Sequence, residues 1–331
     1  MRRREFIAAI SATIAYPPYS HAQQPGSVRR VGVLMAFTEN DPDGKAQLSG
    51  FVQELAELGW LVGRNLRMEV RWGGSDVTQI GIFAKELLAL QPDLIVTQGT
   101  PATAALHQQR TTIPIVFVVV TDPVGHGFVA NLAVPGGNIT GFLTSEAGMG
   151  SKLLELLLAI APDVQRVGML FNPDTAPGGG AYYFEQFEAA ARSSKVEPIA
   201  ARAKSDAEIE SLITLFGREP GGGLVVMPDF FMLNHVKPII SQSARNKVPA
   251  VYPWRVVVTR DGALLSYGPD LADIVRRGAN YVDRVLRGAK PANLPVQVPV
   301  KFEMAVNVKA AKALGLTVPT SILLSANEVI E

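Results

Sequence analysis

The chain has 331 residues, more than a single hydrophobic core usually organises, and this length predicts two domains. Apolar residues make up 47% and charged residues only 18%, a balance that excludes an intrinsically disordered chain. The formal net charge of +1 excludes the basic surface that nucleic-acid binding needs, and the lack of cysteine excludes disulfides, thiolate metal sites, cysteine nucleophiles and a lipid-modified N-terminal cysteine.

The N-terminus has the order of a secretory signal peptide. Three arginines at 2–4 precede a short apolar stretch at 6–15, and a small-x-small cleavage site ends at Ala22. The run from Arg3 and Arg4 to Phe6 and Ile7 resembles a twin-arginine signal, although Ala8 stands where lysine is usual. We therefore predict a twin-arginine signal peptide at 1–22, with an ordinary basic arm as the alternative. The processed chain would then be a soluble periplasmic protein without stable membrane insertion.

Strand-like and helix-like segments alternate through the first half. Strands are predicted at 31–35, 66–72, 93–97 and 113–120, and helices around 51–58, at 80–90 and from Pro101 onward. We expect Thr100 to cap the last of these helices. This alternation predicts a parallel sheet with helices on both faces.

The same rhythm restarts after about residue 145. Strands are predicted at 166–171, 196–201, 223–227 and 248–252, and helices at 152–160, 181–193, 207–216 and 234–245. A strand at 264–267, a helix at 271–286, a proline-rich stretch at 291–299 and a helix at 308–314 follow. This tail is too short for a third domain, so we expect the chain to cross back between two α/β halves.

Ligands of parallel α/β sheets bind beyond the carboxyl ends of the strands. Acidic side chains there could receive a cationic group, helix N-termini an anionic group and aromatic side chains an apolar body, a mixture that suits an amino acid. The candidates in the first half are Thr38, Glu39, Gly99, Thr100, Thr121 and Asp122. Those in the second half are Phe171, Asn172, Asp174, Pro228, Asp229, Tyr252 and Tyr267.

Several candidates also have a purely structural interpretation. Thr100 and Asp122 both precede proline and could serve only as helix N-caps. The segment 172–174 could be a turn, and Trp254 fits the core at least as well as a ligand contact. Glycine clusters at 178–180 and 221–223 lack the residues of phosphate loops, and nucleophile-elbow and metalloprotease motifs are missing, so we expect no catalytic residue, metal or cofactor.

Several motifs resemble a family of ABC transporter substrate-binding proteins that includes tryptophan- and tyrosine-binding members. They lie at 57–65, 122–142, 171–174, 249–253, 266–273 and 311–319. The resemblance implies the type I periplasmic-binding-protein fold, which is α/β with two Rossmann-like lobes and parallel sheets joined by three crossing segments. The crossings would lie near 143–147, 266–270 and 294–300. The lobes would comprise 28–145 plus about 269–294, and 146–266 plus about 297–331.

The function that this resemblance implies is solute capture for an ABC importer, with permease subunits as partners. A small ligand, amino-acid-like or aromatic, would bind between the lobes and favour their closure. The segments 38–41 and 255–260 depart from the family pattern and leave the ligand open. The alternatives are an extracytoplasmic sensor, an enzyme on the same scaffold, and a repressor, which would need a DNA-binding segment in the 27 residues before the first strand.

Overall fold

The computed structural model describes residues 28–74 and 76–331. The predicted signal peptide at 1–22 lies outside these residues. Within them, no helix combines the length and apolar character that a membrane crossing requires.

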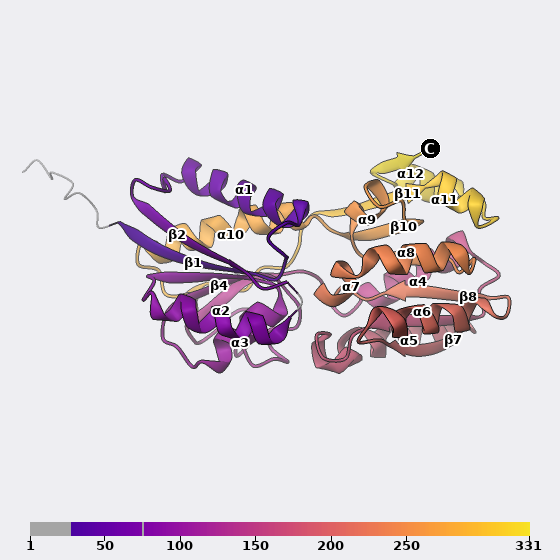
Figure 1. The fold of residues 1–331 in the computed structure, drawn as a ribbon, viewed down its shortest axis with the longest axis horizontal. Coiled ribbons are helices and arrows are strands. Elements are labelled where there is room, and N and C mark those ends of the chain that lie inside the picture. The colour runs from indigo at the N-terminus through magenta and orange to yellow at the C-terminus, as the bar shows by residue number, and fades with distance from the viewer. Residues whose placement is uncertain (1–27, 75) are drawn as a thin grey trace, which may run out of the picture.

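The first lobe, called the N-lobe here, is built on a five-stranded parallel sheet with the order β2-β1-β3-β4-β5. Helices α1 and α10 cover one face of this sheet, and α2 and α3 cover the other (Figure 1). The strands are β1 (Arg29–Met35), β2 (Leu66–Trp72), β3 (Leu94–Gln98), β4 (Ile115–Val120) and β5 (Ile139–Leu143). The helices are α1 (Pro42–Glu57), α2 (Val77–Ala89), α3 (Thr100–Gln108) and α10 (Leu271–Leu286).

The second lobe, the C-lobe, has a seven-stranded sheet with the order β12-β11-β10-β9-β8-β6-β7. Only the β10–β11 pair is antiparallel. The strands are β6 (Arg166–Phe171), β7 (Glu197–Arg202), β8 (Gly222–Val226), β9 (Ala250–Tyr252), β10 (Leu265–Pro269), β11 (Phe302–Asn307) and β12 (Glu328–Ile330). The α-helices are α4 (Met149–Ile160), α5 (Ala181–Ser193), α6 (Asp206–Gly217), α7 (Phe230–Asn234), α8 (Val236–Arg245), α9 (Arg255–Thr259), α11 (Val308–Ala313) and α12 (Thr320–Ser325). Short 3₁₀ helices form at η1 (Pro177–Gly180) and η2 (Pro291–Asn293).

These sheets confirm the predicted α/β class. Every residue of β3 and β4 is buried, and only Thr97 and Gln98 at the end of β3 are polar, because helices cover both faces of the sheet. Although α10 follows the C-lobe strand β10 in the sequence, it packs in the N-lobe beside α1 and β4 (Figure 1). Gly278 allows this packing, since a Cβ there would lie 2.5 Å from Cγ1 of Val118.

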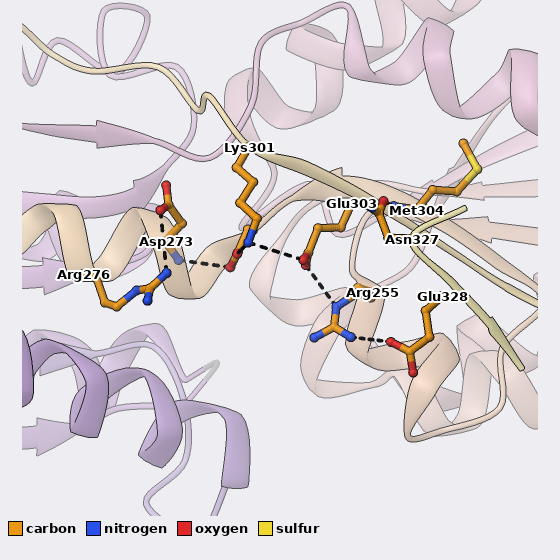
Figure 2. Close-up of polar contacts among 9 residues, drawn as sticks. Arg255, Asp273, Arg276, Lys301, Glu303, Met304, Asn327 and Glu328 are labelled. Carbon is orange, nitrogen blue, oxygen red and sulfur yellow. Dashed lines mark hydrogen bonds and ion pairs between the residues drawn. The ribbon is translucent and has the colours of Figure 1, made fainter. Parts of the chain in front are cut away.

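The chain passes between the lobes three times, after β5, after β10 and before β11 (Figure 1). Charged side chains tie the second and third passages together, as Figure 2 shows. Nζ of Lys301 lies 2.7 Å from the carboxylate of Asp270, which caps α10, and 3.7 Å from that of Glu303. Arg255 bridges Glu303 at 3.0 Å and Glu328 at 2.5 Å. This network fixes the start of α10 against β11.

One short helix was not predicted. The helix predicted at 234–245 corresponds to α8, which begins at Val236, and the additional helix α7 precedes it from Phe230. The carboxylate of Asp229 accepts a hydrogen bond from N of Met232 and so starts α7 directly after the tip of β8. This early start places apolar side chains at the edge of the sheet where a ligand would bind.

Candidate functional site

A small cavity lies between the lobes at the carboxyl ends of β3, β4 and β8. Its free volume is about 10 Å³, and a single buried water needs roughly 10–15 Å³. The N-lobe and the first crossing contribute Thr100, Pro101, Val119, Thr121 and Thr144, and the C-lobe contributes Thr175, Pro177, Pro228, Asp229, Phe230, Leu233 and Trp254. Four of the residues predicted from strand ends, Thr100, Thr121, Pro228 and Asp229, line this cavity, and their role in ligand binding stays a prediction.

Hydroxyl groups make up most of the polar lining. Oγ1 of Thr100 accepts a hydrogen bond from N of Thr121 at 3.1 Å, which joins α3 to the end of β4. The hydroxyl of Tyr183, from the C-lobe, donates to Oγ1 of Thr121 at 3.5 Å and also bonds to the hydroxyl of Ser145. Burial raises the pKa of Tyr183 far above its usual value, so its hydroxyl stays protonated. These bonds connect the two lobes beside the cavity.

Asp229 is the only charged side chain among the lining residues. It is 4% exposed, and its oxygens accept hydrogen bonds from N of Met232 at 2.9 Å and from N of Asn172 at 3.2 Å. Burial raises the pKa of Asp229 to about 6, against the opposing effect of these backbone donors. A buried carboxylate held only by neutral donors is prepared for a cationic partner.

Apolar side chains close the rest of the cavity. The ring of Phe230 meets the ring of Phe37 from the N-lobe edge to face, with centroids 5.6 Å apart and planes at 82°. Trp254 lines the same space and is 5% exposed, so it contributes to the cavity wall as well as to the core. One apolar cluster thus extends from the N-lobe core across the cleft into the C-lobe.

The backbone at the end of β4 is strained where it meets the cavity. Val119 has a φ of 58°, which is rare for a β-branched residue and costs roughly 1–3 kcal/mol. The pairing of β4 with β5 loses its regular register over the same stretch. Asp122 follows with a φ of 46°. The strained stretch therefore lies where β4 ends at the cavity.

Two predicted helix caps are wrong. The N-cap of α3 is Gly99, whose φ is 91°, so Thr100 is the first helical residue and its hydroxyl is free to bond to Thr121. Asp122 precedes a series of turns instead of a helix, and its carboxylate accepts from N of Gly125 at 2.9 Å. Asp122 and Glu146 add to burial in raising the pKa of Tyr182, so Asp122 faces the C-lobe near the cleft.

Other predicted site residues lie away from the cavity lining. Thr38 and Glu39 are exposed. Asp174 is exposed and bonds to Nζ of Lys204 at 2.8 Å. Tyr267 stacks on Phe302 at 5.7 Å, beside the crossing strands.

Three more predicted residues are buried elsewhere in the C-lobe. Phe171 packs beneath Gly180, where a Cβ would lie 2.2 Å from its ring. Asn172 supports Asp229 through its backbone N–H. Tyr252 lines a different, mostly apolar cavity of about 80 Å³ beside α8 and α11.

Some lining residues were not predicted. Thr144 and Thr175 lie just past the ends of β5 and β6, and extending the strand-tip rule by a few residues would have found them. Phe230 and Leu233 belong to α7, whose start the sequence did not indicate. Across the described ranges 28–74 and 76–331, no group of three or more His, Cys, Asp or Glu side chains could hold a metal ion.

Comparisons with known proteins agree with this geometry. A family model described as ABC transporter substrate binding protein matches residues 31–330. A curated tyrosine-binding protein from Clostridioides difficile (strain R20291) is 26% identical over 269 residues, which is 81% of this chain and 76% of the relative.

Two solved structures have a closely similar fold. One is an ABC domain from Streptococcus pneumonia in complex with L-Trp, which is 28% identical with a TM-score of 0.83, covering 92% of this chain and all of that one. The other, a conserved domain protein from Vibrio cholerae O1 biovar El Tor strain N16961, is also 28% identical with a TM-score of 0.84 and the same coverage. The ligand-free, open form of a substrate-binding protein from Clostridium difficile gives a TM-score of only 0.67 at 23% identity, over 92% of this chain and 99% of that one.

Proposed function

The chain belongs to the ABC transporter substrate-binding protein family, and from this premise we propose that it is the periplasmic solute-binding subunit of an ABC importer. It takes up one small, amine-bearing, amino-acid-like ligand between its lobes and presents it to permease subunits. The lobes hinge about the crossings near 143–147, 266–270 and 294–300. The N-lobe then comprises 28–145 with about 269–294, and the C-lobe comprises 146–266 with about 297–331.

The buried carboxylate of Asp229 is the observation that carries the ligand class. It faces an interlobe cavity whose lining residues include no Lys, Arg or His, so an ammonium group from outside would supply the missing positive charge. The N-terminus of α3 at Thr100 forms the opposite wall and suits the carboxylate of the same ligand. Relatives named for tyrosine binding and for an L-Trp complex support an amino acid over a sugar.

Closure follows from where these groups lie. The amine would contact Asp229 on the C-lobe, and the carboxylate would contact α3 on the N-lobe. A ligand that touches both lobes only when they are closed binds the closed state more tightly than the open one. It stabilises the closed state by this difference in binding free energy. The permease then receives a closed, loaded protein.

A thermal-shift screen tests this proposal. Amino acids, simple amines, carboxylates and sugars are added to the full chain, and an amine-bearing amino acid should raise the melting temperature, since ligand at 100 times its Kd contributes about 2.7 kcal/mol. The Asp229→Ala variant should lose about 2–5 kcal/mol of binding free energy. The Asp174→Ala variant is the matched control, because that carboxylate is exposed and bonded to Lys204. If no compound raises the melting temperature, or if Asp229→Ala binds as tightly as wild type, the proposal is wrong.

A further inference from the structure

Phe230 occupies the cleft in a way that a lining residue ordinarily does not. It is the first residue of α7 and follows Asp229 directly, so its ring projects into the same cavity as that carboxylate. The ring is 9% exposed, and it meets Phe37 of the N-lobe edge to face. The C-lobe thereby places an aromatic ring in the N-lobe surface.

The N-lobe has a fitted seat for this ring. A Cβ on Gly99 would lie 2.7 Å from Cε2 and 3.0 Å from Cδ2 of Phe230, so a side chain at position 99 would collide with the ring. The same Cβ would lie 3.1 Å from Cβ of Ala36, which shows how narrow this part of the surface is. The lack of a side chain at Gly99 therefore leaves the space that the ring of Phe230 occupies, with Phe37 against the same ring.

The ring also accounts for the small size of the cavity. Only about 10 Å³ remains free beside Asp229, which is room for a single water. An aromatic amino acid whose amine contacts Asp229 would have to place its own ring where Phe230 lies. Trp254 also lines the cavity, but among the described residues Phe230 is the lining residue whose ring packs on an aromatic ring of the N-lobe.

We propose that Phe230 is the specificity-determining residue of the cleft: its ring fills the subsite for a ligand side chain, selects small amino acids over aromatic ones, and holds the lobes together before ligand arrives. This inference rests on the proposed function for its ligand class. By contacting Phe37 and Gly99, the ring of Phe230 occupies the position that the side chain of a larger ligand would take. A large side chain competes with Phe230, whereas a small one does not.

Calorimetric titration of the full chain with L-alanine, L-tyrosine and L-tryptophan tests the selection. The Phe230→Ala variant should improve the ratio of aromatic to alanine affinity at least tenfold, because it vacates the subsite. Phe230→Leu keeps an apolar side chain and serves if the alanine variant fails to fold. It should shift the ratio in the same direction by a smaller factor. Phe231→Ala is the matched control, since Phe231 is equally buried but stacks on His235 at 4.1 Å and does not line the cavity.

Each outcome decides the matter. The inference is wrong if the ratio of affinities is unchanged, or if the Phe230→Ala variant loses affinity for aromatic amino acids. The proposed function still holds in that case, provided that wild type binds any of the three amino acids. A wild type that binds none of them, with a Phe230→Ala variant that binds an aromatic one, supports it. Absence of binding by every variant overturns the inference, and the broader thermal-shift screen then decides the proposed function separately.

Small-angle scattering of the ligand-free proteins tests the second part without any ligand. Phe230→Ala should have a larger radius of gyration than wild type, because the interlobe contact is lost, and Phe231→Ala should match wild type. Equal radii for all three proteins would show that Phe230 does not hold the lobes together.

Discussion

The side chain of Asp229 has two structural roles. Its oxygens accept from the backbone of α7 and from N of Asn172 at the tip of β6, so the same carboxylate starts a helix and joins two neighbouring strand ends. These donors are neutral, and they only partly offset the cost of burying a charge. The residue is therefore held rigidly while its charge remains uncompensated.

The raised pKa of Asp229 predicts a pH dependence of stability. In the unfolded chain this carboxyl has a pKa near 3.8, and in the folded protein about 6, so between these values the folded state binds more protons. The free energy of unfolding should then fall as pH rises from about 4 to about 6, by on the order of 2–3 kcal/mol from this group, and level off above. Urea midpoints at several pH values, compared between wild type and Asp229→Asn, isolate the effect. Parallel pH profiles for the two proteins would contradict the raised pKa.

Among the residues predicted at strand ends, the polar Thr121 and Asp229 line the cavity, whereas the apolar Phe230 was not predicted. Thr121 directly follows β4 and Asp229 lies three residues past the end of β8, and any parallel sheet brings such positions together. Tyr252 also ends a strand, but its side chain points toward α8, because successive strand positions face opposite sides of the sheet. Phe230 lies in an apolar run that has the composition of a core segment, so nothing in the sequence distinguished it from core.

At the scale of elements, the approach of β5 to β4 depends on one glycine. A Cβ on Gly141 would lie only 1.9 Å from the carbonyl oxygen of Phe117, where the register of the pair is about to shift. This contact is with backbone, so rotating a side chain cannot relieve it. The first crossing segment leaves directly from β5, which makes the position important for the cleft as well.

Gly141→Ala should therefore destabilise the protein by about 1–3 kcal/mol or more, as overpacking does. Gly81→Ala is the matched control, since Gly81 lies inside α2 with no atom within 4 Å of its expected Cβ. That substitution should stabilise the protein by roughly 0.5–1 kcal/mol through helix propensity. Urea denaturation followed by circular dichroism measures both. Midpoints that move in the same direction would refute the close approach at Gly141.

Long periodic elements were predicted well and short ones were not. The bounds of β2, β6, α5 and α10 agree with the predicted ranges. The helices α5 and α10 have a clear apolar period, and β6 is an almost entirely buried run. The strands β11 and β12 were not predicted, and β12 has only three residues at the sheet edge. The helices α7 and α9 have five residues each, little more than one turn, which is too short for a repeating apolar pattern.

The whole molecule is described here with its lobes in contact. Besides Phe230 and Tyr183, an ion pair joins Asp43 of α1 to Arg260, which follows α9. Both side chains of this pair are about one-third exposed, and such pairs contribute roughly 0–1 kcal/mol. This exposed pair therefore contributes little to holding the lobes together. The sequence predicted two lobes and a hinge, but whether the lobes touch depends on side-chain contacts that no periodicity encodes.

The central claim is that one solute binds between the lobes and closes them. Because the chain has no cysteine, spin labels can be placed at Lys85→Cys in α2 and Glu185→Cys in α5, two exposed positions in different lobes on the side away from β11 (Figure 1). The distance between the labels, measured by pulsed electron paramagnetic resonance, should show a minor long-distance population in the free protein, because the Phe230 contact holds the lobes of most molecules together. A saturating amino acid that raises the melting temperature should remove that population and leave the short distance of the closed form. An unchanged distance distribution with the same bound ligand would contradict closure and, with it, the account of this protein as a hinged solute-binding subunit.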